Sequence, residues 1–420
     1  MIPIVPATTT FPIRQIGRTA STTSATTPST TRLVTLPPLT LYIHFPWCVK
    51  KCPYCDFNSH EHADGVGAIP EAAYVDALIA DLDHVVPQVW GRRVHAVFIG
   101  GGTPSLMSPP ALDRLMSEVR ARLVLEADAE ITLEANPGTV EAERFAAYRA
   151  LGINRLSLGI QSFDDRFLKA LGRIHDGDEA RRAVEIALEN FDNVNLDLMY
   201  ALPNQTAEDA ARDVAIARSF GPPHLSLYQL TLEPNTYFAK YPPRLPDDDM
   251  ADAIEDAIAS EVARGGWKRY EVSAYARPGR ESRHNLNYWN FGDYIGIGAG
   301  AHGKLSFPDR IVRQTRVRNP AVYLDRAARA IQPFEEHLVD AQSLPFEFML
   351  NAMRLVDGIP VRRFEERTGV SLAAIEPQLG EAEAKGLMGR DAFRLWPTPI
   401  GLRFLNDLQE LFLPSQGSTA

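Results

Sequence analysis

The sequence has no apolar run near the roughly 18 residues that a membrane-spanning helix requires, and only three cysteines in 420 residues. The first absence argues against a transmembrane span. The small, odd number of cysteines argues against the disulfide framework of a small secreted domain. Basic residues are also in deficit, and a net charge of -10 does not indicate a nucleic-acid partner. Reduced thiols and the missing span together predict a cytoplasmic protein.

Acidic residues are missing from the N-terminal part of the chain. None occurs before Asp56, and residues 1–38 are rich in Ser, Thr and Pro without a sustained hydrophobic period. This composition predicts a disordered Ser/Thr/Pro-rich extension. Arg14, Arg18 and Arg32 leave an organellar transit peptide open as the alternative. A secretory signal is not expected, because no charged start is followed by an apolar core.

All three cysteines lie in one segment. Cys48, Cys52 and Cys55 have the spacing CxxxCxxC and follow residues 39–45, an alternating apolar run that predicts a β-strand. Thiolates are the usual ligands of iron–sulfur centres, and three of them can hold three irons of a 4Fe-4S cluster. The fourth iron is then free to chelate a small molecule, as in radical S-adenosylmethionine (SAM) proteins. A zinc site and unpaired structural thiols are the alternatives, although zinc prefers four protein ligands.

Between residues 39 and 270, buried-strand patterns alternate with helical patterns. Six strand-then-helix units can be counted, the last helix covering 247–264. Such repeats require a parallel sheet with helical crossovers. Polar residues follow successive strands, on the face where barrel enzymes build their sites. The sequence therefore predicts an α/β fold with a partial, laterally open (β/α)6 TIM-type barrel over 39–270, rather than an open doubly wound sheet.

The pattern changes after the barrel. Residues 271–343 are rich in Gly, Asn and aromatic residues and are predicted to form a connecting segment, after one further strand over 269–275. Residues 344–413 show short helical patterns with one β-like stretch, which predicts a small C-terminal helical, winged-helix-like domain. Residues 414–420 are predicted to be a frayed tail.

Glycine and polar residues at the ends of the predicted strands are candidates for ligand binding. They are Gly101, Gly102, Thr103, Glu134, Gln161 and Asp197; Arg173, in LGRIHD, is a separate candidate that could meet a carboxylate or be a surface cation at a helix end. Glycine lets a backbone approach a ligand closely, and the carboxylates suit hydroxyl or ammonium groups. Each residue taken alone is more often structural, but several on one face favour a polar ligand. Tyr54, directly before the third cysteine, either covers the cluster, contacts an adenine ring or is an apolar plug.

Two later motifs have competing interpretations. Gly298, Gly300 and Gly303 fit the GxGxxG pattern, but they do not follow the first strand, so a dinucleotide site is not expected. His284 lies in HNLNYW, which is predicted to be a loop, and His302 follows it. Imidazole is a common axial ligand of haem iron, yet a histidine among aromatic residues is more often structural.

Eight motifs together resemble the oxygen-independent coproporphyrinogen III oxidase superfamily of radical SAM proteins and, within it, the HemW-type haem chaperones. They are LYIHFPWCVKKCPYCDF, GGGTPS, TLEANPG, SLGIQSF, LGRIH, LDLMYALP, HNLNYW and GIGAGAH. The resemblance covers about residues 37–412. It implies a 4Fe-4S cluster, SAM and a HemN-type C-terminal domain, with the cysteines as cluster ligands. The residues that match SAM contacts are Tyr42, Tyr54, Gly101, Gly102, Thr103, Glu134, Gln161, Arg173 and Asp197.

Two features set the chain apart from the decarboxylating oxidases. Those enzymes carry a further cysteine two residues after the third, where this chain has Phe57, and HNLNYW matches the HNxxYW motif proposed for haem binding in the chaperone branch. The resemblance thus makes His284 the candidate haem contact, with His302 as a weaker one.

The predicted function is a haem chaperone that binds haem and transfers it to respiratory haem proteins, with no catalytic residue assigned. The cluster and SAM would then serve structure, dimerisation or redox-gated release. The alternative is an oxygen-independent coproporphyrinogen III oxidase, or another radical SAM enzyme acting on a tetrapyrrole. The sequence leaves open whether the protein forms a homodimer and whether it contacts a membrane peripherally.

Overall fold

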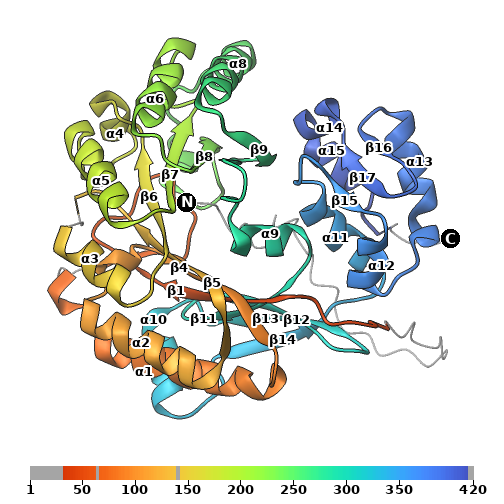
Figure 1. The fold of residues 1–420 in the computed structure, drawn as a ribbon, viewed down its shortest axis with the longest axis horizontal. Coiled ribbons are helices and arrows are strands. Elements are labelled where there is room, and N and C mark those ends of the chain that lie inside the picture. Colours follow the sequence, from red (N-terminus) through yellow and green to blue (C-terminus); the bar gives the residue numbers. More distant parts are fainter. Residues whose placement is uncertain (1–31, 63–65, 139–141, 415–420) are drawn as a thin grey trace. The chain divides into compact units, whose positions relative to one another are not determined.

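A computed structural model describes residues 32–62, 66–138 and 142–414 (Figure 1). Most of the predicted N-terminal extension, residues 1–31, lies outside the described residues. The described chain divides into two compact units. The first comprises Pro38–Lys304 and Gln314–Glu336, and the second comprises 32–37, Leu305–Arg313 and 337–414. No helix among the described residues is long and apolar enough to cross a membrane.

Six parallel strands form the centre of the first unit, in the sheet order β1-β4-β5-β6-β7-β8. Their bounds are β1 Leu39–Phe45, β4 Arg93–Gly101, β5 Val124–Ala135, β6 Arg155–Gln161, β7 Val194–Tyr200 and β8 His224–Gln229. The helices between and after them are α1 Glu71–Val85, α2 Pro109–Arg122, α3 Ala142–Ala150, α4 Asp165–Ala170, α5 Gly177–Asn190, α6 Ala207–Phe220 and α8 Asp248–Gly265. These helices lie along the outer side of the curved row of strands (Figure 1). The predicted α/β class with six strand–helix units is confirmed.

Local sequence explains where these elements begin and end. Every residue of β1 and β6 is buried, as expected for parallel strands covered on both faces. Thr206 caps α6 in a capping box with Asp209, and Gly221 ends it in the left-handed conformation.

Short elements complete the β–α connections. They are β2 Trp47–Cys48, β3 His60–Glu61, η1 Val66–Ala68, η2 Val86–Gln88, η3 Pro104–Leu106 and α7 Tyr237–Lys240.

The structure differs from the sequence prediction after α8. The single strand predicted over 269–275 is two antiparallel strands, β9 Lys268–Glu271 and β10 Ala274–Ala276. The predicted connecting segment is also structured, with α9 Arg283–Trp289, β11 Asp293–Ile297, β12 His302–Ser306, β13 Ile311–Arg316, α10 Pro320–Ala328 and β14 Phe334–Leu338. β11 pairs in parallel with β1, so the sheet has twelve strands. Short strands broken by glycine and asparagine carry too few residues to show a period, which is why the sequence did not reveal them.

The second unit contains short helices and a small antiparallel sheet of order β15-β17-β16. Its elements are α11 Leu344–Ala352, β15 Ile359–Pro360, α12 Arg362–Thr368, η4 Leu372–Ile375, α13 Glu376–Ala384, β16 Met388–Arg390, β17 Arg394–Pro397, α14 Pro399–Arg403 and α15 Leu405–Glu410. Phe348 and Phe364 pack edge to face in its core. Leu33 is buried in this unit and its N–H donates to Pro308 O, so the predicted disorder does not extend to residue 33.

Candidate functional site

The cysteine loop leaves the C-terminal end of β1. Cys48, Cys52 and Cys55 are free and half-buried, and the Cys55 N–H donates to Cys52 O at 3.2 Å. Trp47 and Cys48 pair with His60 and Glu61 in a two-stranded sheet that closes the base of the loop. Within the described ranges, no three His, Cys, Asp or Glu side chains are grouped so that they could hold one metal ion.

Glycines of the segment after β4 let it pack directly against this loop. The N–H of Gly102 donates to Phe45 O at 2.7 Å, and that of Thr103 donates to Trp47 O at 2.8 Å. A Cβ on Gly102 would lie 2.4 Å from Trp47 O, and Gly101 has a φ of +118°. Only glycine allows this approach, so these two glycines shape the loop whether or not they also contact a ligand.

The GxGxxG segment holds the other side of the same loop. Asn58, just beyond the third cysteine, donates from Nδ2 to Ala299 O at 2.9 Å and to Arg318 O at 2.8 Å. Gly300 has a φ of +81°, and a Cβ there would lie 2.4 Å from Asn58 Nδ2. Gly300 therefore allows close packing on Asn58, and Gly298 allows close packing on His44 O at the end of β1.

Burial controls the protonation of the thiols. The pKa of Cys48 is raised to about 11, chiefly by burial and also by the neighbouring Cys55 and Cys52, while the hydroxyls of Thr103 and Ser59 lower it. Burial also raises the pKa of Cys55. The Cys48 and Cys55 thiols are therefore protonated at neutral pH until a metal displaces the protons. A cationic Arg173 lies at the loop, with Nη1 3.6 Å from Cys52 Sγ. Three adjacent thiols with hydroxyl and guanidinium donors fit an anionic thiolate-bound cluster.

Arg173 connects the cysteine loop to the strand ends. Its Nη2 donates to Asn136 Oδ1 at 2.6 Å and to Gly159 O at 2.9 Å. Asn136 Nδ2 donates in turn to Thr103 Oγ1 at 3.1 Å. Gln161 Nε2 lies 3.0 Å from the position of a Cβ on Gly159, which places the Gln161 side chain beside the same group. Asn136 was not singled out from the sequence, although it stands in the TLEANPG motif.

Glu134 and Asp197 are two further buried carboxylates in this part of the sheet. Glu134 accepts the Gly101 N–H on Oε2 at 3.1 Å, and burial together with the charge of Asp197 raises its pKa to about 7. Asp197 accepts hydrogen bonds from Ser157 Oγ and Asn195 Nδ2, both at 2.9 Å. Ser157 and Asn195 are further residues that the sequence did not reveal, because a single polar residue inside a buried strand carries no recognisable pattern.

The two tyrosines predicted as SAM contacts differ in position. Tyr54 is half-buried in the cysteine loop, 6.4 Å from the ring of Phe238. Tyr42 is buried, donates or accepts a hydrogen bond with His44 Nδ1 at 2.8 Å, and stacks on Phe98. Tyr54 thus lies with the cysteines, and Tyr42 lines the inner face of the sheet.

His284 lies away from the cysteine loop, at the end of the sheet where β1 and β11 begin. HNLNYW is helical as α9, not the predicted loop, because Ser282 caps its first turn. The His284 ring is 1% exposed, stacks on Phe98 with centroids 5.0 Å apart, and has no hydrogen-bond partner on either nitrogen among the described residues. Burial lowers its pKa to about 3, so the imidazole is neutral. His302 is half-buried, with Nδ1 3.4 Å from Thr315 Oγ1.

Most of the predicted SAM contacts are thus close to the three cysteines at one end of the sheet. Tyr54 lies in the loop, and Gly101, Gly102, Thr103 and Arg173 lie against it, whereas Glu134 is joined to it through Gly101 and Gln161 lies beside Gly159. Asp197 and Tyr42 are buried in the sheet, and the Tyr42 ring lies 6.3 Å from that of His284. That these residues contact SAM or haem stays a prediction.

Comparisons with known proteins agree with this arrangement. Residues 42–215 match the Radical SAM superfamily model, and residues 339–404 match the HemN C-terminal domain model. The fold is similar to that of coproporphyrinogen III oxidase (HemN) from Escherichia coli, with a TM-score of 0.75, 22% identity and 90% of each chain covered.

The sequence is similar to curated heme chaperones. It is 51% identical to "Heme chaperone HemW" of Escherichia coli, with 91% of this chain and 100% of the relative covered. It is 47% identical to the protein of the same name from Haemophilus influenzae, with 91% and 99% covered. The chain therefore belongs to the HemW heme chaperone family of radical SAM proteins.

Proposed function

We propose that the protein binds haem and transfers it to acceptor haem proteins of respiration, and that it carries a 4Fe-4S cluster and SAM. The observation that carries the proposal is 51% identity with a heme chaperone over that relative's whole length. Phe57 stands where the oxidases of the superfamily carry a further cysteine, which also favours the chaperone.

The cysteine loop would hold the cluster, and the network beside it would hold SAM. Thiolates of Cys48, Cys52 and Cys55 would ligate iron, with the Arg173 guanidinium at the loop offsetting their negative charge. A cluster held by these cysteines would be able to supply one electron at low potential, the chemistry by which radical SAM enzymes cleave SAM. In its ionised form, the Glu134 carboxylate would accept a hydrogen bond from a polar group of SAM.

Haem contact by His284 would require α9 to move. In the described conformation the imidazole is covered by Phe98, Tyr42 and Tyr288, with ring centroids 5.0, 6.3 and 4.9 Å away. A porphyrin cannot reach a side chain that is 1% exposed. The proposal for His284 therefore includes an opening of α9, whereas a purely structural role includes none.

The second candidate function is that of a true radical SAM enzyme acting on a tetrapyrrole. It is favoured by the continuous polar network from Cys52 through Arg173, Asn136 and Thr103, which a chaperone without SAM chemistry would not need. A homodimer, a cytoplasmic location and peripheral membrane contact remain part of the proposal.

The decisive experiment is an anaerobic haem titration of the cluster-reconstituted protein, followed by absorbance, with 5'-deoxyadenosine measured in the same samples. His284→Phe retains a ring that can stack on Phe98 and removes both nitrogens; His284→Ala also removes the ring. We expect near-stoichiometric haem binding that both variants weaken, without substantial SAM cleavage.

Three outcomes would contradict parts of this proposal. Absence of haem binding by the wild type would overturn the chaperone function. Haem binding unchanged in His284→Phe would remove His284 as an iron ligand. Conversion of coproporphyrinogen III to protoporphyrinogen would establish the second candidate instead.

A further inference from the structure

Gln161 has an unusual backbone conformation at the end of β6. Its φ is +67°, a left-handed value that residues with a Cβ seldom adopt. The N–H of Ser162 donates to Ile160 O at 2.9 Å, which closes a γ-turn centred on Gln161. Such a strained turn persists only when surrounding contacts fix it, and strain of this kind clusters at functional sites.

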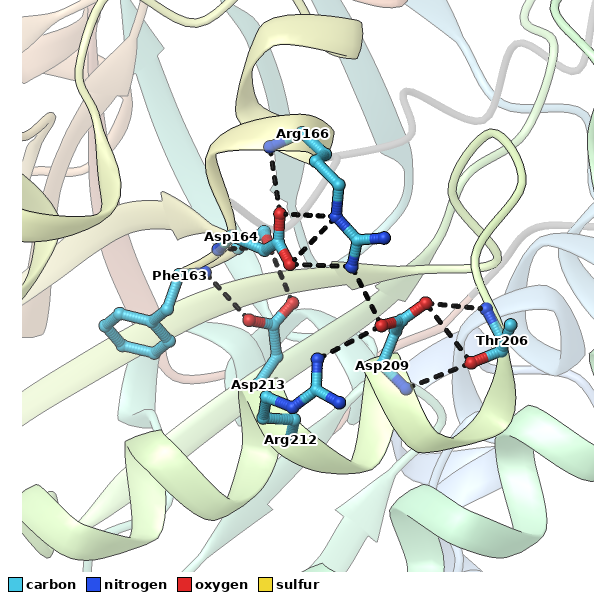
Figure 2. A network of polar contacts seen from close by, with 8 residues as sticks. Phe163, Asp164, Arg166, Thr206, Asp209, Arg212 and Asp213 are labelled. Carbon is cyan, nitrogen blue, oxygen red and sulfur yellow. Dashed lines mark hydrogen bonds and ion pairs between the residues drawn. The ribbon is translucent and has the colours of Figure 1, made fainter.

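The contacts that fix the turn come from Asp213 on α6. Ser162 Oγ donates to Asp213 Oδ2 at 2.7 Å, and the N–H of Phe163 donates to Asp213 Oδ1 at 2.8 Å (Figure 2). Asp213 is 4% exposed, so both bonds lie away from water. One carboxylate therefore holds the two residues that directly follow Gln161.

A second connection joins the same elements at the surface. Arg166 donates from Nη2 to Asp164 at 2.8 Å and to Asp209 at 2.9 Å, and Asp209 caps α6 together with Thr206 (Figure 2). The Arg166 side chain is 64% exposed, and its partner Asp164 reaches the turn, since the Asp164 N–H donates to Ser162 Oγ at 3.0 Å. Asp209 is thus linked to the turn only indirectly, through Arg166 and Asp164, and exposed, screened ion pairs contribute little to stability.

We infer that Asp213 is a positioning residue for SAM: through Ser162 and Phe163 it holds the strained turn that directs Gln161 toward Arg173 and the cysteine loop. Asp213 itself lies on α6, behind the turn, and does not take part in the group around Arg173. The inference rests on the proposed SAM contact of Gln161.

The test is SAM binding by the cluster-reconstituted protein, measured by equilibrium dialysis beside its iron content and melting temperature. Asp213→Ala removes both hydrogen bonds, and we expect it to weaken SAM binding about tenfold or more with iron content unchanged. Asp213→Asn still presents an amide oxygen to Phe163 N–H and an amide N–H to Ser162 Oγ, so it should retain affinity within about threefold.

Asp209→Ala is the matched control, because it breaks the surface connection between the same elements. We expect it to lower the melting temperature while SAM affinity changes less than about twofold. Equal losses of affinity in Asp213→Ala and Asp209→Ala would overturn the inference, as would failure of Asp213→Asn to restore binding.

The variant Gln161→Ala distinguishes a failure of this inference from a failure of the proposed SAM contact on which it rests. If Gln161→Ala weakens SAM binding but Asp213→Ala does not, Asp213 has no positioning role while the SAM site stands. If Gln161→Ala leaves SAM affinity unchanged, Gln161 is not a contact and the inference is wrong. If the wild type binds no SAM at all, the proposed cofactor is wrong.

Discussion

At the scale of single residues, Glu134 shows how burial makes ligand binding depend on pH. Its carboxyl is 5% exposed, and burial raises its pKa to about 7. About half of the population is thus protonated at neutral pH. Hydroxyl or ammonium groups of a ligand hydrogen-bond best to the ionised form, so a ligand of this kind and a proton compete for the same oxygens.

SAM affinity should therefore fall as the solution becomes more acidic. From pH 8 to pH 6 the ionised fraction drops about tenfold, and we expect the dissociation constant of SAM to rise by about the same factor. Calorimetric titration at several pH values measures this. Glu134→Gln cannot ionise and should bind weakly with a flat profile, whereas Glu143→Gln, on the exposed surface of α3, should keep the wild-type slope. A wild-type slope in Glu134→Gln would assign the pH dependence to another group.

At the scale of elements, α9 is held in place by one carboxylate. Glu130 Oε1 accepts the N–H groups of Arg283 at 3.0 Å and His284 at 3.4 Å, and Ser282 Oγ at 3.4 Å. Asn287 Nδ2 fixes the other end by donating to Asp293 O at 2.7 Å. The two ring nitrogens of His284, buried without partners in the described chain, contribute nothing to holding the helix.

Removal of the Glu130 carboxylate should loosen α9. We expect Glu130→Ala to speed amide hydrogen exchange in residues 283–289 by about 10- to 100-fold, since hydrogen bonds to a charged acceptor contribute about 1.5–3 kcal/mol. Glu126→Ala, which loses only a half-exposed pair with Arg283, is the control and should change exchange little. If haem reaches His284 by opening of α9, haem association should also become faster in Glu130→Ala. Faster exchange with unchanged haem association would exclude that route.

At the scale of the whole molecule, a buried ion pair joins residues 235 positions apart. Arg316 Nη2 lies 3.2 Å from Asp81 Oδ1, and both side chains are fully buried. Tyr323 OH donates to Asp81 Oδ2 at 2.8 Å and the Gly298 N–H donates to it at 3.1 Å. Asp81 thereby holds α1 against β13, α10 and the glycine segment that packs on the cysteine loop.

Breaking this pair should affect stability far more than breaking a surface pair. Asp81→Asn leaves the Arg316 charge buried and uncompensated, so we expect the free energy of unfolding in urea to fall by about 3–5 kcal/mol. Asp76→Asn, whose partner Arg114 is exposed, should cost less than about 1 kcal/mol. Similar losses of unfolding free energy in Asp81→Asn and Asp76→Asn would contradict this prediction, because they would mean that water solvates the Arg316 charge.

Much of the first unit could be predicted from local pattern. The run 39–45 is a strand with the predicted bounds, because the alternating apolar residues of a buried strand leave a recognisable pattern. β11 could not be predicted for two reasons. Its five residues, two of them aromatic or acidic, show no hydrophobic period, and the residues of β1 with which it pairs lie about 250 positions earlier in the sequence.

The sequence by itself determined the family, the cysteine spacing and the alternation of strands and helices, because these depend on residues near one another in the chain. Only the tertiary structure decided that Asn136 binds Arg173, that Asn58 binds Ala299, that Asp213 binds Ser162, and that His284 is covered by Phe98. Hydrogen bonds and burial depend on which distant segments meet, and a single polar residue carries no local signal of its partner.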